Sequence, residues 1–424
     1  MKTVTSLLLL STFTASTLTL TARATEQGGG VPVLPCPLGP EADLWVLAGQ
    51  SNMQGCGLIT RTYPANPKIM MLDLSNEWMP AVPPIHRVYT AAAPVYRNTV
   101  LQKNPTLTVE AWDKIVADAR KKPSGGVGLE LSFAVSMVGA TGRPVGLIPC
   151  ALGSTAMADW DPAGLAKGEL SLYGNMVRRI RMAGGKIKGL LWYQGESDAA
   201  VSTVGQFQAA FLNFVDCLRR DTGIADLPVI YVQISRVCME NQTGAPEWEQ
   251  VRELQRTLAA QRRNLWVVPA IDLPLDDLIH VGEAGHERLG RRVAEVALTH
   301  LYHLPGHGTP IDFKSCEILP PLDVLHHRLR VTFSGVTGRI QAQGRPAGFE
   351  LRSDDPKKDG PMVFKVEPDP EHPDAVIVWY SKAIEAPVRL YYGAGLNPYA
   401  NLTDSLDMAV PAFGPIKIDP KSAP

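Results

Sequence analysis

The stretch Asp43-Leu-Trp-Val-Leu-Ala-Gly49 is apolar along nearly its whole length, so neither of its faces suits contact with water. A strand buries both faces when helices cover both sides of its sheet, as they do in parallel sheets. Four similar apolar runs follow, at residues 144–152, 187–194, 227–235 and 265–273. Together these five runs predict the strands of one parallel sheet.

Segments with a helical period separate the predicted strands. Between the third and fourth runs, apolar residues recur at i, i+3, i+4, i+7, i+8 and i+11, and Gly223 can end this helix. The recurring residues are Phe207, Ala210, Phe211, Phe214, Val215 and Leu218. Further helices are expected at 129–138, 172–182, 249–261 and 283–301. The alternation predicts an α/β fold whose parallel sheet lies between two layers of helices.

Two parts of the chain depart from this alternation. Residues 60–127 are rich in Pro and aromatic residues and suggest a long insertion of the kind that often shapes a substrate site. After Gly306, short β-like runs are separated by Gly, Pro, Asp and Lys, at 328–333, 349–352, 375–380 and 388–392. We therefore expect one domain at 43–305 and a smaller β-rich module at 312–424.

Composition and charge restrict the class of protein. The chain has 424 residues, of which 45% are hydrophobic and 20% charged, which is enough to build a large core. The 41 Lys+Arg and 42 Asp+Glu give a net charge of −1, and no long basic run is present. The sequence therefore predicts no nucleic-acid partner.

The first residues have the features of an export signal. Lys2 precedes a short apolar run, and Ala22-Arg-Ala24 offers small residues at a cleavage position. We expect a signal peptide at 1–24 and a lead-in at 25–42; an uncleaved membrane anchor is the alternative. No later run approaches 18 apolar residues, so the mature chain should have no membrane span and should be secreted or periplasmic.

The six cysteines leave the redox state open. Their number is even, which permits disulfides in an exported chain, but buried free thiols explain them equally well. They are Cys36, Cys56, Cys150, Cys217, Cys238 and Cys316. No CxxC pair and no zinc-type spacing is present, so a metal site is not expected.

Ser51 is the first candidate catalytic residue. It follows the first predicted strand within Gly49-Gln-Ser-Asn-Met53, at the edge where open α/β sheets bind ligands. A serine here can act as a nucleophile whose own N–H helps to hold an oxyanion; alternatively, it only caps a helix. The GxSxG motif of ordinary α/β-hydrolases is absent.

An acid and an imidazole follow the last predicted strand. In Asp277-Leu-Ile-His280 the carboxylate can fix the ring tautomer while the other ring nitrogen faces a serine. The three-residue spacing favours Asp277 over the adjacent Asp276 as the acid. With Ser51, these residues predict a triad in the chain order Ser, Asp, His, which needs no metal or cofactor.

A third polar segment follows the 187–194 run. Gln194 can donate side-chain N–H groups to an oxyanion, and Gly195 allows close approach of the backbone. The alternative is a polar turn without a catalytic role.

These segments together resemble the SGNH hydrolase superfamily, and more closely its sialate O-acetylesterase and acetylxylan-esterase type of carbohydrate esterase. The resemblance rests on GQSNM at 49–53, GVGLE at 126–130, WYQGES at 192–197 and DLIH at 277–280. It implies a flavodoxin-like three-layer α/β/α domain, and the β-rich end is similar to the module that follows this domain in bacterial sialate O-acetylesterase-like proteins.

The resemblance also implies residue roles. Ser51 is the expected nucleophile, Asp277 and His280 complete the triad, and the N–H groups of Ser51 and Gly128 with Gln194 form the oxyanion hole. The chain departs from the family at Leu129, Ser154 and Val281, where Pro, Gly and Pro are frequent, which leaves the substrate undecided.

The substrate is expected to be an acetylated carbohydrate, such as sialic acid or a plant polysaccharide like xylan. Trp160 resembles a family tryptophan near the acyl pocket and could stack on a sugar, or it packs within its loop. Gln50 and Glu196 either bind substrate or tie the turns together. Two other functions stay open: a broader SGNH lipase, thioesterase or arylesterase, and a glycan-binding protein without catalysis. The oligomeric state is undetermined.

Overall fold

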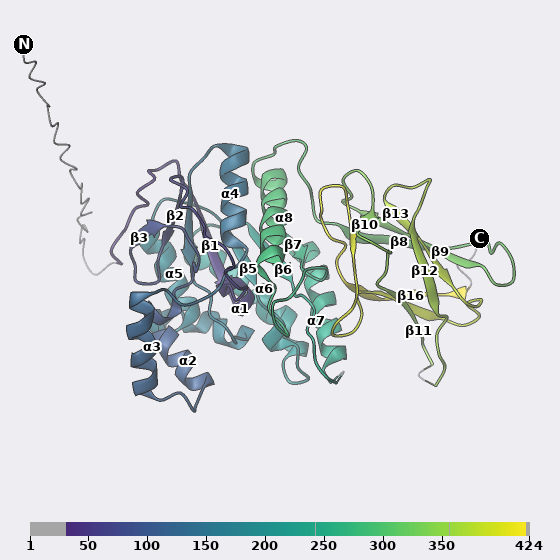
Figure 1. Ribbon diagram of the computed structural model, residues 1–424, viewed down its shortest axis with the longest axis horizontal. Helices are drawn as coiled ribbons and strands as arrows, with labels where there is room; N and C mark the ends of the chain where they lie inside the picture. The colour runs from purple at the N-terminus through teal and green to yellow at the C-terminus, as the bar shows by residue number, and fades with distance from the viewer. Residues whose placement is uncertain (1–30, 242, 356, 421–424) are drawn as a thin grey trace, which may run out of the picture.

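The computed structural model describes residues 31–241, 243–355 and 357–420. The predicted signal peptide and part of the lead-in lie outside these residues. Within them the chain forms a helix-covered sheet, followed along the long axis of the molecule by a β-rich module (Figure 1). None of the described helices has the length and apolar character needed to cross a membrane.

A seven-stranded sheet is the centre of the first part, in the order β3-β2-β4-β1-β5-β6-β7. All neighbouring pairs are parallel except β2 and β3. The five predicted strands are confirmed as β1 (Asp43–Gly49), β4 (Val145–Pro149), β5 (Lys186–Tyr193), β6 (Val229–Gln233) and β7 (Leu265–Pro269). β1 lies between β4 and β5, so its carboxyl end opens at the middle of the sheet.

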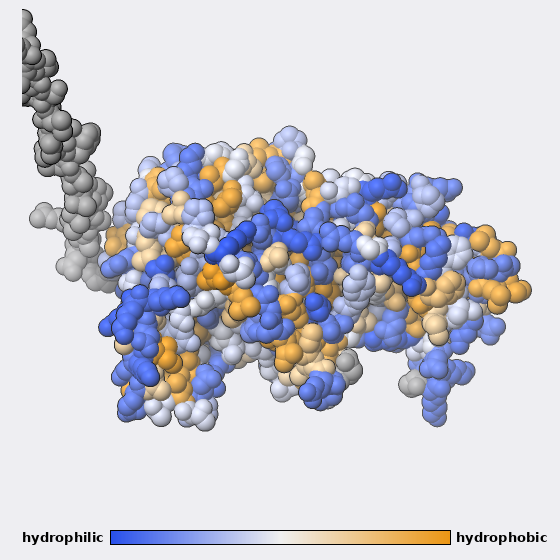
Figure 2. All heavy atoms as spheres, viewed as in Figure 1, coloured by the Kyte–Doolittle hydropathy of each residue, from blue (hydrophilic) through white to orange (hydrophobic). Residues whose placement is uncertain are grey.

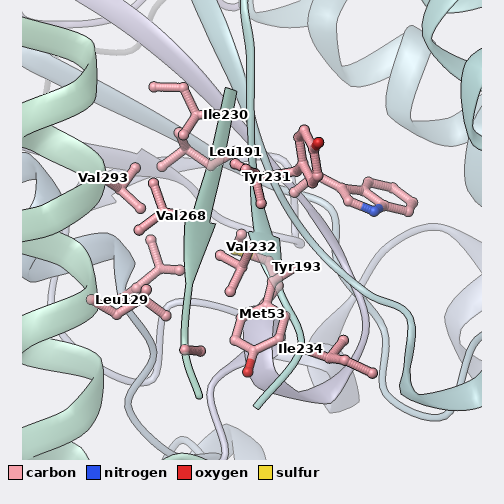
Figure 3. Packing of buried hydrophobic residues seen from close by; sticks show 14 of the residues in the cluster. Met53, Leu129, Leu191, Tyr193, Ile230, Tyr231, Val232, Ile234, Val268 and Val293 are labelled. Atoms are coloured by element: carbon pink, nitrogen blue, oxygen red, sulfur yellow. The ribbon is translucent and has the colours of Figure 1, made fainter. Parts of the chain in front are cut away.

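Helices cover both faces, as the apolar strands require. The α4 helix (Glu130–Thr141) packs against α8 (Glu283–Leu301), while α5 (Leu172–Ala183), α6 (Val204–Thr222) and α7 (Ala245–Leu258) pack in series on the other face (Figure 1). Figure 3 shows Leu129, Val268 and Val293 meeting in the layer between the sheet and α8. Gly223 ends α6 in a left-handed conformation, as predicted.

The 60–127 insertion adds to the sheet itself. It forms β2 (Ile69–Leu72) and β3 (Trp78–Pro80), then the 3-10 turn η1 (Val88–Thr90) and the helices α2 (Pro94–Lys103) and α3 (Val109–Lys121). These strands are three and four residues long, too short for a sequence period to mark them. The insertion therefore extends the β4 edge of the sheet, an arrangement the sequence did not predict.

In the described residues after α8, all strand pairs are antiparallel. The strands of this module are β8 (Asp312–Leu319), β9 (His327–Ser334), β10 (Gln341–Ala342), β11 (Phe349–Ser353), β12 (Val363–Pro368), β13 (Ala375–Tyr380), β14 (Val388–Tyr392), β15 (Leu402–Thr403) and β16 (Phe413–Ile418). All four predicted runs are strands. Hydrophobic side chains gather at the end of the module farthest from the helix-covered sheet (Figure 2).

Buried arginines join the two parts. Arg252 of α7 is almost completely buried and donates to the carbonyls of Ser235, Gly393, Gly395 and Leu396. The last three belong to the loop after β14, so one guanidinium connects the sheet edge to the module.

The cysteines are free thiols, and all six lie in the described part of the chain. Cys150 and Cys217 are buried, which agrees with the thiol alternative. Burial raises the pKa of Cys150 to about 11, so this thiol stays protonated at neutral pH.

Replacing Arg252 should therefore destabilise the whole chain. Arg252→Ala leaves four carbonyls without their donor, and we expect a loss of about 3 kcal/mol or more in the free energy of unfolding. Thermal unfolding of Arg252→Ala measures this, with the exposed Arg339→Ala as control. A melting temperature equal to that of the control would contradict the role of Arg252.

Candidate active site

Ser51 stands where β1 ends and the short helix α1 (Ser51–Gln54) begins. The chain approaches β5 closely at this point: a side chain at Gly49 would collide with the backbone of Tyr193, and Gly49 has a φ of 132°. Only glycine satisfies both conditions. Ser51 is half-buried, and its hydroxyl has no hydrogen-bond partner in the described structure. The hydroxyl is thus free for a substrate.

The loop between β7 and α8 brings Asp277 to His280. The Nδ1 atom of His280 lies 2.6 Å from Oδ2 of Asp277. The other carboxylate oxygen accepts from the backbone N–H groups of Ile279, at 2.8 Å, and His280, at 2.7 Å. Because Asp277 holds Nδ1, the tautomer with a free Nε2 is favoured, as a general base requires.

Partial burial acts to raise the pKa of Asp277. Its hydrogen bonds with the His280 ring and with two backbone N–H groups outweigh this effect and hold the pKa below its ordinary value. Asp277 is therefore charged at neutral pH and can stabilise a protonated imidazole.

Cys56 is a neighbour of His280 that sequence reasoning missed. A hydrogen bond with the Cys56 side chain is the largest cause of a raised His280 pKa; burial opposes it, Asp277 adds to it, and the pKa is about 9. The only signal in the sequence is that Cys56 follows Ser51 by five residues. The pKa of His280 therefore lies above the ordinary value of an imidazole.

Asn52 connects the nucleophile segment to the histidine loop. Its Oδ1 accepts from Val281 N–H at 3.0 Å, and its Nδ2 lies 3.4 Å from the carbonyl oxygen of Ile279. These two groups flank His280 in the chain. Nδ2 also donates to Oε1 of Glu196 at 2.8 Å. Asn52 is fully buried, so these bonds have no competition from water.

Asp276 and Asp272, the other acids near this loop, are engaged elsewhere. Asp276 accepts from the backbone N–H groups of Leu58 and Glu283, so it joins the segment after α1 to the start of α8. Asp272 pairs with Arg292 at 2.7 Å. Neither acid bonds to the ring of His280, which supports Asp277 in that place.

Gly128 lies beside α1. Backbone hydrogen bonds join the segment around Gly57 to Gly126 and Val127. The N–H groups of Gly128 and Ser51 donate no hydrogen bond within the described residues, so both are available to an oxyanion. A Cβ atom at Gly128 would collide with the Glu130 carboxylate, so a larger residue there would require the Glu130 side chain to shift.

Behind Gly128 lies a buried pair that the sequence did not reveal. The Nδ1 atom of His86 is 3.2 Å from Oε1 of Glu130, and both side chains are buried. Their remaining polar atoms, Nε2 and Oε2, have no partner. Because His86 comes from the insertion, 44 residues before Glu130, only the folded chain brings them together.

Gln194 is near the site, but its amide hydrogens are occupied. Nε2 bonds to the carbonyl oxygen of Thr155 at 3.1 Å and to Oδ2 of Asp198 at 2.5 Å, while Oε1 has no partner. Asp198 also accepts from Met157 N–H at 2.9 Å. Gln194 thus holds the loop after β4 in place, and an oxyanion role would require it to leave these partners.

The three residues expected at the substrate are inside the protein. Trp160 is 0% exposed, packs edge-on against Trp192 at 5.3 Å and donates to Thr155. Its indole faces are not open to a sugar. Gln50 accepts from the N–H groups of Gly195 and Ser197, and Glu196 from Asn52. These positions favour the packing and turn-tying alternatives.

Comparison with known proteins identifies the family. Residues 41–299 match the family described as carbohydrate esterase, sialic acid-specific acetylesterase. The chain belongs to this family. It is therefore a carboxylic ester hydrolase of the carbohydrate-esterase type, and the resemblance inferred from the four motifs is confirmed.

Two relatives illustrate the extent of the similarity. A probable carbohydrate esterase of Arabidopsis thaliana is 29% identical over 288 residues, covering 64% of this chain and 98% of that protein. A crystal structure of a carbohydrate acetylesterase from Xanthomonas citri aligns with a TM-score of 0.63 and 20% identity, over 89% of this chain and 80% of that one. The second likeness establishes the shared fold.

The raised pKa of His280 predicts the pH dependence of esterase activity. A general base must be unprotonated, so kcat/KM for p-nitrophenyl acetate should rise as pH increases through about 9. Cys56→Ala removes the largest contribution to the raised pKa and should move this rising limb to lower pH. Rates from about pH 5 to about pH 10, corrected for spontaneous hydrolysis, measure it. Cys316→Ala is the control; identical profiles for both variants would contradict the Cys56 contact.

Asn52 should act on turnover through the position of His280. Asn52→Ala leaves Val281 N–H and the Glu196 carboxylate unpaired, and we expect kcat to fall about a hundredfold with KM little changed. The exposed Asn213→Ala is the matched control. Steady-state kinetics of folded Asn52→Ala test this, and an unchanged kcat would refute the positioning role.

Proposed function

We propose that this carbohydrate esterase is an exported serine enzyme that removes O-acetyl groups from sugars through Ser51, His280 and Asp277. The observation that carries the proposal is the 2.6 Å contact between His280 and Asp277, on a loop that is hydrogen-bonded to Asn52, the residue next to Ser51. An imidazole oriented by a carboxylate and a serine hydroxyl without a partner are the groups that nucleophilic acyl transfer needs.

The mechanism follows from these groups. His280 takes the Ser51 proton as Oγ attacks the acetyl carbonyl, and Asp277 stabilises the imidazolium that forms. The N–H groups of Ser51 and Gly128 receive the oxyanion. Because both amide hydrogens of Gln194 are occupied, we assign it a positioning role in this step. The imidazolium protonates the departing sugar oxygen as its bond to the acetyl carbon breaks, so the sugar leaves with a free hydroxyl and the acetyl group stays on Ser51 Oγ. Water activated by His280 then releases acetate from Ser51.

A cavity of about 390 Å³ is lined in part by Gly128, while Ser51, Asp277 and His280 are not among its lining residues; it could hold the part of a substrate that extends beyond the oxyanion hole. Apolar Val127, Leu131 and Val135 line one part of it, and Arg61 and Glu283 line another. A polar and apolar lining suits an esterified sugar. Export is supported by the pattern of residues 1–24, and an acetylated carbohydrate by the description of the family as a sialic acid-specific acetylesterase.

Acetate release tests this proposal. Acetylated xylan and O-acetylated sialic acid are offered side by side to the wild type, Ser51→Ala and His280→Ala. We expect release by the wild type and a loss of about a thousandfold or more in each variant, because the triad acts as a unit. The substrate from which the wild type releases acetate faster identifies the substrate class.

The adjacent acid provides a matched control. Asp277→Asn should reduce kcat strongly, by about a thousandfold or more, because it removes the charge that orients and stabilises the imidazolium. Asp276→Asn should keep most of the activity. Full activity of folded Ser51→Ala, or a defect in Asp276→Asn but not in Asp277→Asn, would refute the assignment.

A further inference from the structure

The C-terminal module contains a groove of about 300 Å³, which is lined by the segment that precedes β11, by the strand β12 and by Tyr399. Tyr399 and Phe364 both line it and are 66% and 40% exposed. Pro346, Ala347 and Val363 complete its apolar wall. Two aromatic rings open to water beside a concave apolar surface suit the C–H face of a sugar ring.

The charged residues that line the groove are all positive. Arginine and lysine are the only charged residues among those that line it. Lys365 is neutralised by Glu367, whose carboxylate is 2.7 Å from its Nζ. Arg345 is exposed and forms no ion pair with any residue in the described ranges. The groove therefore presents one uncompensated guanidinium, which attracts a carboxylate.

The groove is also held in a fixed shape. Asn401 donates to the carbonyls of Gln343 and Arg345, both at 2.9 Å, and accepts from Ala347 N–H at 3.1 Å. The Arg345 guanidinium itself donates to the carbonyl of Phe364 across the groove. The Asn401 amide thus fixes the segment that carries Arg345. Because this segment is already ordered, binding of a ligand would cost it little conformational entropy.

We propose that this groove binds a carboxylate-bearing sugar residue of a glycan, with its carboxylate on Arg345 and its ring against Tyr399. A neutral sugar would leave the guanidinium unused, and a basic ligand would be repelled by it. The shared chemistry, a pyranose with a carboxylate, is found both in sialic acids and in uronic acids. This binding site is separate from Ser51, and the module would hold a glycan independently of ester cleavage.

Calorimetric titration of the full chain tests the proposal with probes that carry no O-acetyl group. Sialyllactose and trigalacturonate represent the two acidic sources, and lactose and xylohexaose are the neutral counterparts. We expect at least one acidic probe to bind and both neutral probes to bind more weakly. Arg345→Ala and Tyr399→Ala should each weaken acidic binding about tenfold or more.

Two control variants separate the groove from general effects. Arg339→Ala removes an exposed arginine of the same module, and Tyr399→Phe keeps the ring; both should bind like the wild type. Neutral probes binding as tightly as acidic ones, no binding of any probe, or unchanged binding by both groove variants would overturn the proposal.

Ester hydrolysis distinguishes this failure from failure of the proposed function. Arg345→Ala should hydrolyse p-nitrophenyl acetate like the wild type, and Ser51→Ala should bind the acidic probe like the wild type. Weak hydrolysis by Arg345→Ala, or loss of probe binding in Ser51→Ala, would contradict two separate sites.

Discussion

The buried amide of Asn52 is the interaction on which the proposed site depends. Its two polar atoms reach Glu196 and the backbone on both sides of His280, groups that are 144 and more than 220 residues away in sequence. A side chain of this kind can satisfy its hydrogen bonds only when the ends of β1, β5 and β7 meet correctly. The fold therefore positions the histidine, and errors in strand register would disrupt the site.

The strands, helices and site loops could be predicted because their signals are local. Apolar runs identified five strands, and the phenylalanines of α6 have a clear helical period. The side-chain environments could not be predicted in the same way. Trp160 and Glu196 follow strands, as substrate-binding residues often do, yet packing of the α6 face and the Asn52 amide place both inside. The contacts of Cys56 with His280 and of His86 with Glu130 form only when the chain folds, because the partners are far apart in sequence.

The charges of the proposed site favour transfer of the Ser51 proton to His280. Asp277 is held charged and His280 has a high affinity for a proton, so the imidazolium formed after attack by Ser51 is well stabilised. The β-rich module is tied to the same framework, since Arg292 of α8 is buried between Asp272 and Asp407. The module is thus attached through buried ion pairs, while the groove proposed to bind an acidic sugar is exposed.

The central claim is that Ser51 carries the acyl group. Mass spectrometry of the chain after treatment with a serine-directed organophosphonate tests it most directly, because only an activated serine reacts. The account predicts a single adduct, located on the peptide that contains Ser51 and absent from Ser51→Ala. An adduct on another residue, or one that persists in Ser51→Ala, would contradict it.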